Sequence, residues 1–248
     1  MQKIFSFLFL IGTLVIGSSF AAAENSDQKT IPLFNGQNLD GWYKFLQKQG
    51  KDNDPDKVFT VENGVIHVSG TEFGCITTNE EYENYTLEVE YRVGQSSYGS
   101  RKDKPFDSGI LLHSRGQNGA YGGVWMNSIE VQVMEGDTGS FYVVCNKQND
   151  DFQITVPAKD GHYDPEGEKT HGYTPGSAIR RSPEAQKAEK PRGEWNLVRM
   201  IAKGDTIEVY LNGLLVNRAE NVKPQRGRIQ IQSEGAEFFY KRIDLTPL

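Results

Sequence analysis

The stretch TLEVEYRV, Thr86–Val93, alternates polar and apolar residues without a slip. A period of two predicts a β-strand with one face in the core and the other in water. Asn212-Gly213, between Leu211 and Leu214, predicts a tight hairpin, because both central positions of that turn need a positive φ. Many short strands joined by polar turns predict an all-β sandwich or jelly roll. Further segments of this kind are Val61–Val68 with a turn at Glu62–Gly64, Gly109–Ser114, Ser128–Val133, Phe141–Val144, Trp195–Ile201, Thr206–Leu211, Arg228–Gln232 and Phe238–Leu245.

Two stretches do not follow this pattern. Residues 24–56 include a polar run, Lys48–Lys57, which we expect to be a surface loop. Residues 146–194 are polar, contain several Gly and Pro residues, and lead to a short helix-prone segment, Pro183–Ala188. A structureless loop of this length is uncommon inside a compact domain and is more often functional than decorative. We therefore expect residues 146–194 to form a long loop with a functional role.

The N-terminus has the features of a secretory signal peptide. Lys3 precedes an apolar run, Ile4–Ile16, and Ala21 and Ala23 fit the small-x-small cleavage rule. We expect residues 1–23 to be removed, which leaves 24–248 as a single domain in the periplasm or outside the cell. The apolar run is too short to span a bilayer, so membrane insertion is not expected. A net charge of −6 with scattered Lys and Arg argues against a nucleic-acid partner.

Alternation also gathers polar side chains on one face of three predicted strands. A surface of carboxylate, amide and guanidinium groups suits a carbohydrate, because sugar hydroxyls need both donors and acceptors. The alternative is a solvated face of the sandwich without a ligand. Trp125, in a Gly-rich segment, either stacks on a sugar ring or packs within its loop. The residues that share a face are Asp107, Gly109, Leu111, His113 and Arg115 on the first strand, Glu130 and Gln132 on the second, and Arg228, Gln230 and Gln232 on the third.

Seven short motifs are spread along the chain. In chain order they are LFNGQNLDGW (Leu33–Trp42), VENGVI (Val61–Ile66), DSGILL (Asp107–Leu112), EVQVME (Glu130–Glu135), GEWN (Gly193–Asn196), LNG (Leu211–Gly213) and RGRIQIQSEG (Arg226–Gly235). Together, over about Ile31 to Leu248, they resemble the 3-keto-disaccharide hydrolase family, also described as 3-keto-glucoside 1,2-lyase and 3-keto-2-hydroxy-glucal hydratase and formerly a bacterial domain of unknown function. The sequence departs from the family pattern at Asp107, where Asn is usual, and at His113, near the usual Arg.

This resemblance implies a concanavalin A-like jelly roll of two antiparallel sheets, with the ligand on a concave face. It also implies a secreted carbohydrate-active enzyme that cleaves 3-keto-glycosides by elimination and hydration. The ketone at carbon 3 acidifies the proton on carbon 2, so a side chain can remove it; the aglycone then leaves carbon 1 and water adds back. Such chemistry needs a base, a group that stabilises the enolate oxygen, and an acid for the leaving group. We expect catalysis by His113 and Glu130, and substrate binding by Asp107, Arg115, Gln132, Trp125, Gln230 and Gln232.

Two other functions stay open. EVQVME also resembles the catalytic strand of retaining β-glucanases on the same fold, in which two carboxylates act as nucleophile and acid/base. Glu130 and Glu135 would take these roles, although Gln132 stands where the central acid is expected. The second alternative is a non-catalytic carbohydrate-binding module, because a fold alone does not decide function.

We expect no cofactor. His113, Glu130, Glu135 and Asp137 offer nitrogen and oxygen ligands, which leaves a divalent cation as an alternative, but no short metal-binding motif is present.

The two cysteines, Cys75 and Cys145, are compatible with two states. In an oxidising compartment they form either one disulfide or two buried thiols, and both states give the same sequence pattern. Two cysteines alone do not make a zinc knuckle.

Overall fold

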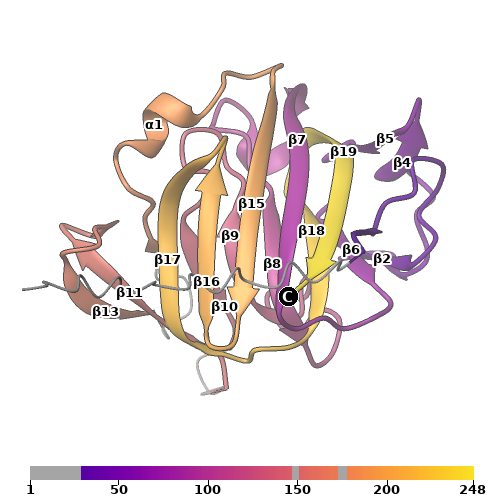
Figure 1. Cartoon of the computed structure of the whole chain (residues 1–248). Coiled ribbons are helices and arrows are strands. Elements are labelled where there is room, and N and C mark those ends of the chain that lie inside the picture. The colour runs from indigo at the N-terminus through magenta and orange to yellow at the C-terminus, as the bar shows by residue number, and fades with distance from the viewer. Residues whose placement is uncertain (1–28, 147–150, 173–177) are drawn as a thin grey trace, which may run out of the picture.

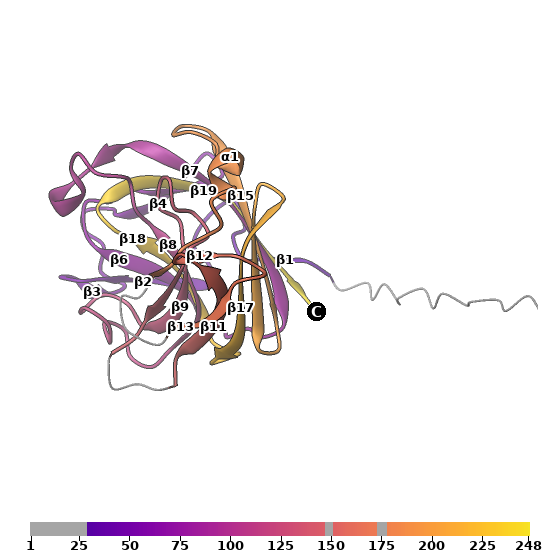
Figure 2. The same cartoon turned by 90° about the vertical axis from the view of Figure 1, so that its left-hand side faces the viewer.

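The alternating segments pair into two antiparallel β-sheets that pack face to face (Figures 1 and 2). The computed structural model describes residues 29–146, 151–172 and 178–248. The predicted signal peptide, residues 1–23, lies outside this range. The expected jelly-roll sandwich of two antiparallel sheets is confirmed.

The larger sheet has eleven strands in the described part of the chain. Its order is β12-β11-β17-β16-β15-β7-β19-β5-β4, with β1 paired to β19 and β13 paired to β11. Figure 1 shows the centre of this sheet towards the viewer. Its strands are β1 (Ile31–Pro32), β4 (Phe59–Glu62), β5 (Val65–Val68), β7 (Tyr85–Ser97), β11 (Gln153–Lys159), β12 (His162–Tyr163), β13 (Glu168–Gly172), β15 (Trp195–Lys203), β16 (Thr206–Leu211), β17 (Leu214–Lys223) and β19 (Ala236–Pro247).

The smaller sheet has eight strands in the described part, in the order β14-β10-β9-β8-β18-β6-β2-β3. One face packs on the larger sheet, and we call the opposite face the site face. Its strands are β2 (Trp42–Leu46), β3 (Gly50–Lys51), β6 (Gly74–Thr78), β8 (Gly109–Arg115), β9 (Asn127–Gln132), β10 (Phe141–Val144), β14 (Ala178–Ile179) and β18 (Arg228–Ser233).

Two hairpins show why these strands end where they do. Asn212 and Gly213 have φ values of 49° and 91°, and Asn63 and Gly64 have 52° and 77°. Asn and Gly tolerate this left-handed region better than other residues, so each pair reverses the chain in two residues. The first pair joins β16 to β17 and the second joins β4 to β5.

The core lies between the sheets. Large side chains of the larger sheet, including Tyr91 and Phe238, are almost fully buried there. Ile129 and Val131 of β9, with Ile231 of β18, belong to the same buried cluster. Alternation then directs the residues between them to the site face. The predicted orientation of these two strands therefore agrees with the structure.

The expected loop at residues 146–194 is only partly a loop. Its described residues form β11, β12, β13 and β14, together with one short helix, α1 (Ala185–Ala188), within the predicted helix-prone segment. The strands β11 and β13 extend the larger sheet at its edge. Residues 24–56, also predicted without strands, contain β1, β2 and β3. In the part of the chain that the structure describes, no helix combines the length and hydrophobicity needed to span a bilayer.

Candidate functional site

A cavity of about 300 Å³ opens on the site face, above β8, β9, β10 and β18. A larger hollow of about 430 Å³ lies near Gln153 and Asp205, but it lacks a comparable cluster of buried carboxyl groups. We therefore place the candidate site in the smaller cavity and call it the Glu130 cavity. Its polar and aromatic lining residues are Arg101, Asp107, Tyr121, Trp125, Glu130, Gln132, Tyr142, Gln232 and Glu234.

Strand register positions Glu130. Glu130 on β9 lies opposite Leu111 on β8, and Gln132 lies opposite Gly109. Gly109 has no side chain, and the space above it holds the carboxyl group of Glu130 and the amide of Gln232: a β-carbon at position 109 would overlap both Oε1 atoms. The glycine thus lets two polar groups from separate strands meet at the floor of the cavity.

Arg101 is the positive charge of the site. It lies on the 3₁₀ turn η1 (Gly99–Arg101), and its guanidinium forms ion pairs with the carboxylates of Asp107 and Glu234. Its side chain is about a quarter exposed, whereas that of Asp107 is almost fully buried. One cation therefore compensates two buried carboxylates, and Glu130 brings a third carboxyl group to the same cavity.

This crowding changes the protonation of the carboxyl groups. Burial raises the pKa of Glu130 well above its ordinary value, and the charges of Glu234 and Asp107 raise it further, while Arg101 opposes them. Burial and the neighbouring Glu234 raise the pKa of Asp107 to about 7. Burial also raises the pKa of Glu234, again against the effect of Arg101. Asp107 is therefore partly protonated near neutral pH, and the raised pKa of Glu130 makes its carboxylate a stronger base than an ordinary one.

Two amides and two rings complete the lining. The amide of Gln232 is buried beside the Glu130 carboxyl group, whose pKa it lowers by hydrogen bonding, and it makes no other side-chain hydrogen bond among the described residues. The Oε1 atom of Gln132 accepts a hydrogen bond of 3.0 Å from the backbone of Val133. Trp125 donates its indole N–H to the carbonyl of Gly74 at 3.3 Å, and its ring stacks on Tyr121 with centroids 6.4 Å apart.

His113 lies outside this cavity, which corrects the predicted orientation of its side chain. The register of β8 against β9 contains one extra residue between Leu112 and Arg115, and His113 adopts a φ of 53°. Such a bulge reverses the alternation. The imidazole is buried against Tyr85, donates from Nδ1 to the carbonyl of Pro224 at 2.7 Å, and has a pKa lowered by burial to about 4.

The same bulge separates Arg115 from the other predicted residues. Arg115 is exposed, donates to the carbonyl of Arg226 at 2.6 Å, and lines a different hollow near Pro224. Gln230 is fully buried below the site face: its Nε2 donates to Thr77, and its Oε1 accepts from the backbone of Met126. Gln230 therefore holds Met126, the residue that follows Trp125, and does not line the cavity.

Glu135 is not brought to Glu130. Its carboxylate pairs with Arg192 at 2.6 Å, in a separate hollow lined also by Phe106. The hydrogen bonds from Arg192 lower the pKa of Glu135, so it stays ionised. The predicted β-glucanase pair, Glu130 and Glu135, is therefore not assembled.

Two charged residues of the site, Glu234 and Arg101, were not predicted from the sequence. Glu234 follows β18 within the RGRIQIQSEG motif, so its place in a motif was the available signal. Arg101 lies in a polar turn between β7 and β8, where no pattern distinguishes it from a solvated charge. Tyr142 of β10 also lines the cavity, and it sits opposite Glu130 in the strand register.

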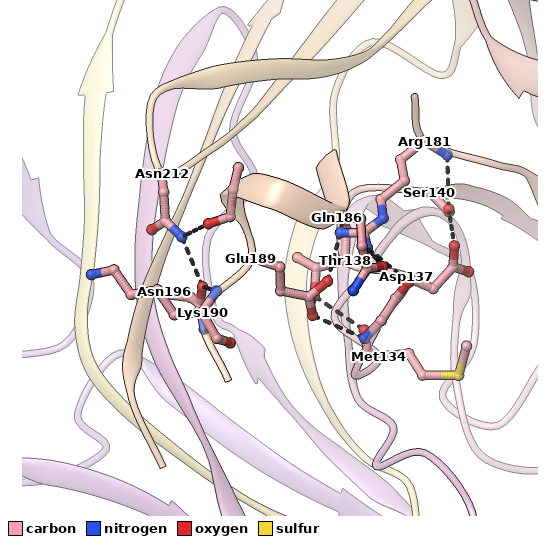
Figure 3. A network of polar contacts seen from close by, with 12 residues as sticks. Met134, Asp137, Thr138, Ser140, Arg181, Gln186, Glu189, Lys190, Asn196 and Asn212 are labelled. Atoms are coloured by element: carbon pink, nitrogen blue, oxygen red, sulfur yellow. Dashed lines mark hydrogen bonds and ion pairs between the residues drawn. The ribbon is translucent and has the colours of Figure 1, made fainter. Parts of the chain in front are cut away.

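A buried polar network supports one wall of the cavity (Figure 3). Arg181 and Glu189 form an ion pair of 2.6 Å, both almost fully buried, and Glu189 accepts a hydrogen bond from the backbone of Gly136 at 3.0 Å. Arg181 also donates to the carbonyl of Thr138. These contacts fasten the segment around α1 to the turn after β9, which begins at Met134, a residue of the cavity lining.

The His, Cys, Asp and Glu side chains bear on the alternatives of a metal ion and of a disulfide. Among the described residues, no three His, Cys, Asp or Glu side chains are grouped so that they could hold a metal ion. Cys75 and Cys145 are both buried, and no disulfide joins them in the described structure. Burial raises the pKa of the Cys75 thiol to about 12.

Solved structures with the same architecture include two provisionally named glycosyl hydrolases from Parabacteroides distasonis ATCC 8503. The first has a TM-score of 0.56 at 18% identity, covering 88% of this chain and 94% of the other; the second has 0.54 at 20%, covering 89% and 100%. A β-glucanase of Bacillus licheniformis has a TM-score of 0.51 at 11% identity, covering 91% and 100%. At these identities the similarity shows the fold alone. Comparison with curated protein sequences gives no match.

The two packed antiparallel sheets and the polar cavity on the site face define a jelly-roll domain with a pocket of carboxyl and amide groups. The sequence profile of the 3-keto-alpha-glucoside-1,2-lyase-like domain matches residues 29–246, so the chain belongs to this family. Family membership makes it a carbohydrate-active enzyme domain, and a carbohydrate is the fitting substrate.

Proposed function

We propose that the chain cleaves 3-keto-glycosides by elimination followed by hydration. In the first step the C2–H bond and the bond from C1 to the aglycone oxygen break, and a C1–C2 double bond forms next to the ketone. In the second step water adds to C1 and a proton returns to C2, which gives a 3-keto sugar. The observation that carries this proposal is the buried Glu130 carboxyl group, whose pKa is raised, in a cavity that also contains Arg101.

Glu130 is the proposed base. A carboxylate of ordinary pKa is a weak base, and burial brings its proton affinity closer to what removal of a ketone-activated proton requires. The nearby carboxylates of Glu234 and Asp107 act in the same direction. Because Glu130 lies at the cavity floor above Gly109, it faces any ring that fills the cavity.

Three other residues stabilise the enolate, bind the sugar and protonate the leaving group. Arg101 supplies the positive charge that stabilises the developing enolate oxygen, and the Gln232 amide beside Glu130 binds sugar hydroxyls. Asp107, with a pKa of about 7, carries a proton in part of the molecules at neutral pH and donates it to the leaving oxygen. His113 takes no part in this scheme, since it contacts Tyr85 and Pro224.

We also propose that the protein is exported. The support is the sequence pattern of Lys3, the apolar run Ile4–Ile16 and the Ala21-x-Ala23 site. N-terminal sequencing of the native protein is expected to start near Glu24, and an uncleaved N-terminus would contradict export by this route.

The proposed activity is tested with a 3-keto-glucoside and its unoxidised parent. The wild type is expected to cleave only the keto compound, and Glu130→Gln is expected to slow this cleavage roughly 10²-fold or more, the usual contribution of a positioned base. Glu135→Gln is the matched control, because it makes the same change outside the cavity. Cleavage of the unoxidised glucoside would indicate a glycosidase, and binding of both compounds without turnover would indicate a binding module.

A further inference from the structure

A second cavity, of about 180 Å³, adjoins the Glu130 cavity. The two cavities share their dividing wall. Glu234 lines the Glu130 cavity, and the next residue, Gly235, lines the second cavity. In the turn η1, Arg101 lines the Glu130 cavity and Gly99 lines the second. Trp125 of the first cavity also contacts Phe73 of the second, with ring centroids 6.2 Å apart.

The second cavity combines an aromatic surface with hydrogen-bonding groups. Tyr98 is 41% exposed, unusual for so large a side chain, and Phe73 is half-buried beside it in the lining. Thr71 and Glu72 provide a hydroxyl and a carboxylate. Rings that cover the C–H face of a sugar, together with a few acceptors for its hydroxyls, are the features of a carbohydrate-binding pocket.

The backbone holds this surface in place. The N–H of Tyr98 donates to the carbonyl of Gly235 at 2.7 Å, and the N–H of Arg101 donates to the carbonyl of Tyr98 at 3.0 Å. Glu72 accepts a hydrogen bond from the backbone of Lys48 at 2.7 Å, and its own carbonyl accepts from Ser233. One turn therefore fixes both Tyr98 and the catalytic cation Arg101, so the two cavities keep a constant relative position.

We propose that the second cavity is a subsite for a pyranose ring in the leaving group, with Tyr98 as its stacking platform and Glu72 as a hydroxyl acceptor. This inference rests on the proposed function, because it assigns the reacting 3-keto ring to the Glu130 cavity. Two joined rings then fill the two cavities on either side of the Phe73–Trp125 contact. Tyr98 and Glu72 determine specificity for a saccharide leaving group and do not touch the reacting atoms.

The test compares two substrates in both anomeric forms: a disaccharide of two glucose units oxidised at carbon 3 of the non-reducing ring, and methyl 3-keto-glucoside. Tyr98→Ala is expected to lower kcat/KM for the disaccharide about tenfold more than for the methyl compound, mainly through KM. Glu72→Gln is expected to act in the same direction. Leu214→Ala is the control, since Leu214 is 40% exposed on the larger sheet. Equal losses on both substrates would overturn the subsite.

A second measurement separates this proposal from the proposed function. Calorimetry with the unoxidised disaccharide requires no turnover, and Tyr98→Ala is expected to weaken its affinity about tenfold. Absence of binding to the wild type, or equal affinity of the two proteins, would overturn the subsite. If the wild type cleaves neither keto compound, the proposed activity fails while calorimetry still decides the subsite.

Discussion

Glu130 of β9 and Gln232 of β18 lie side by side above Gly109 of β8, the strand that separates them in the smaller sheet. A carboxyl group and an amide meet there only because position 109 has no β-carbon. The strand register therefore determines which polar groups meet in the cavity, since the residue that makes room for them is on β8, between the other two strands.

Gly109→Ala is expected to lower kcat/KM roughly 10²-fold without unfolding the protein, because the added methyl group displaces the Glu130 carboxyl from its position. Steady-state kinetics on a 3-keto-glucoside, with circular dichroism to confirm folding, check this expectation. Ile110→Val is the control: Ile110 of the same strand is fully buried in the core, so the loss of one methyl group costs about 0.5–1.5 kcal/mol of stability and leaves the cavity lining unchanged. Kinetics of Gly109→Ala equal to the wild type would contradict the placement of Glu130.

Asp107 is expected to make stability depend on pH. Its folded-state pKa of about 7 lies above the ordinary value of about 3.9, so its contribution favours the folded state below about pH 4 and is lost as the pH rises to about 7. Asp107→Asn removes this loss of stability at higher pH, because the amide does not titrate. The free energy of unfolding of the variant, relative to wild type, is therefore expected to increase from pH 4.5 to pH 7.5, as measured by urea unfolding.

The titration of His113 makes the folded state more stable as the pH rises from about 4 to about 6.5, because burial lowers the pKa of this imidazole to about 4. Its contribution is present in both proteins and cancels in the comparison. A stability difference between Asp107→Asn and wild type that does not change with pH would contradict the raised pKa.

The Arg181–Glu189 pair is expected to be essential for stability. Arg181→Met leaves Glu189 buried without its cation, which costs about 3–5 kcal/mol. Arg192→Met, which breaks the partly exposed pair with Glu135, is expected to cost about 0–1 kcal/mol. Urea unfolding of the two variants measures the difference, and equal destabilisation would show that burial of the pair does not matter.

Much of this site follows from side-chain alternation. Glu130, Gln132 and Gln232 reach one cavity because Ile129, Val131 and Ile231 require the core. Alternation is a local property, so it holds as long as the register is regular.

Prediction from the sequence is wrong where the strand register or the path of the chain depends on tertiary contacts. The bulge before Arg115 redirects His113, and no residue type at that point indicates an extra residue. Arg101 comes from a turn whose position depends on contacts with Gly235. The strand β13 was not predicted because its residues, Glu168–Gly172, are polar and lie beyond β11 at the end of the sheet. The strand β11 does carry an alternating apolar pattern, since Ile154, Val156 and Ala158 lie in the core, but Pro157 and the polar residues around it hid that pattern.

The fate of the hydrogen on carbon 2 tests the central claim most directly. A 3-keto-glucoside labelled with deuterium at C2 is cleaved in ordinary water, and the product is examined by mass spectrometry and nuclear magnetic resonance, with reactions lacking enzyme and containing Glu130→Gln as references for spontaneous exchange. Elimination by Glu130 predicts a slower reaction than with the unlabelled compound, and a 3-keto sugar that has lost the label. Cleavage at equal rates, with the deuterium fully retained at C2, would contradict the account.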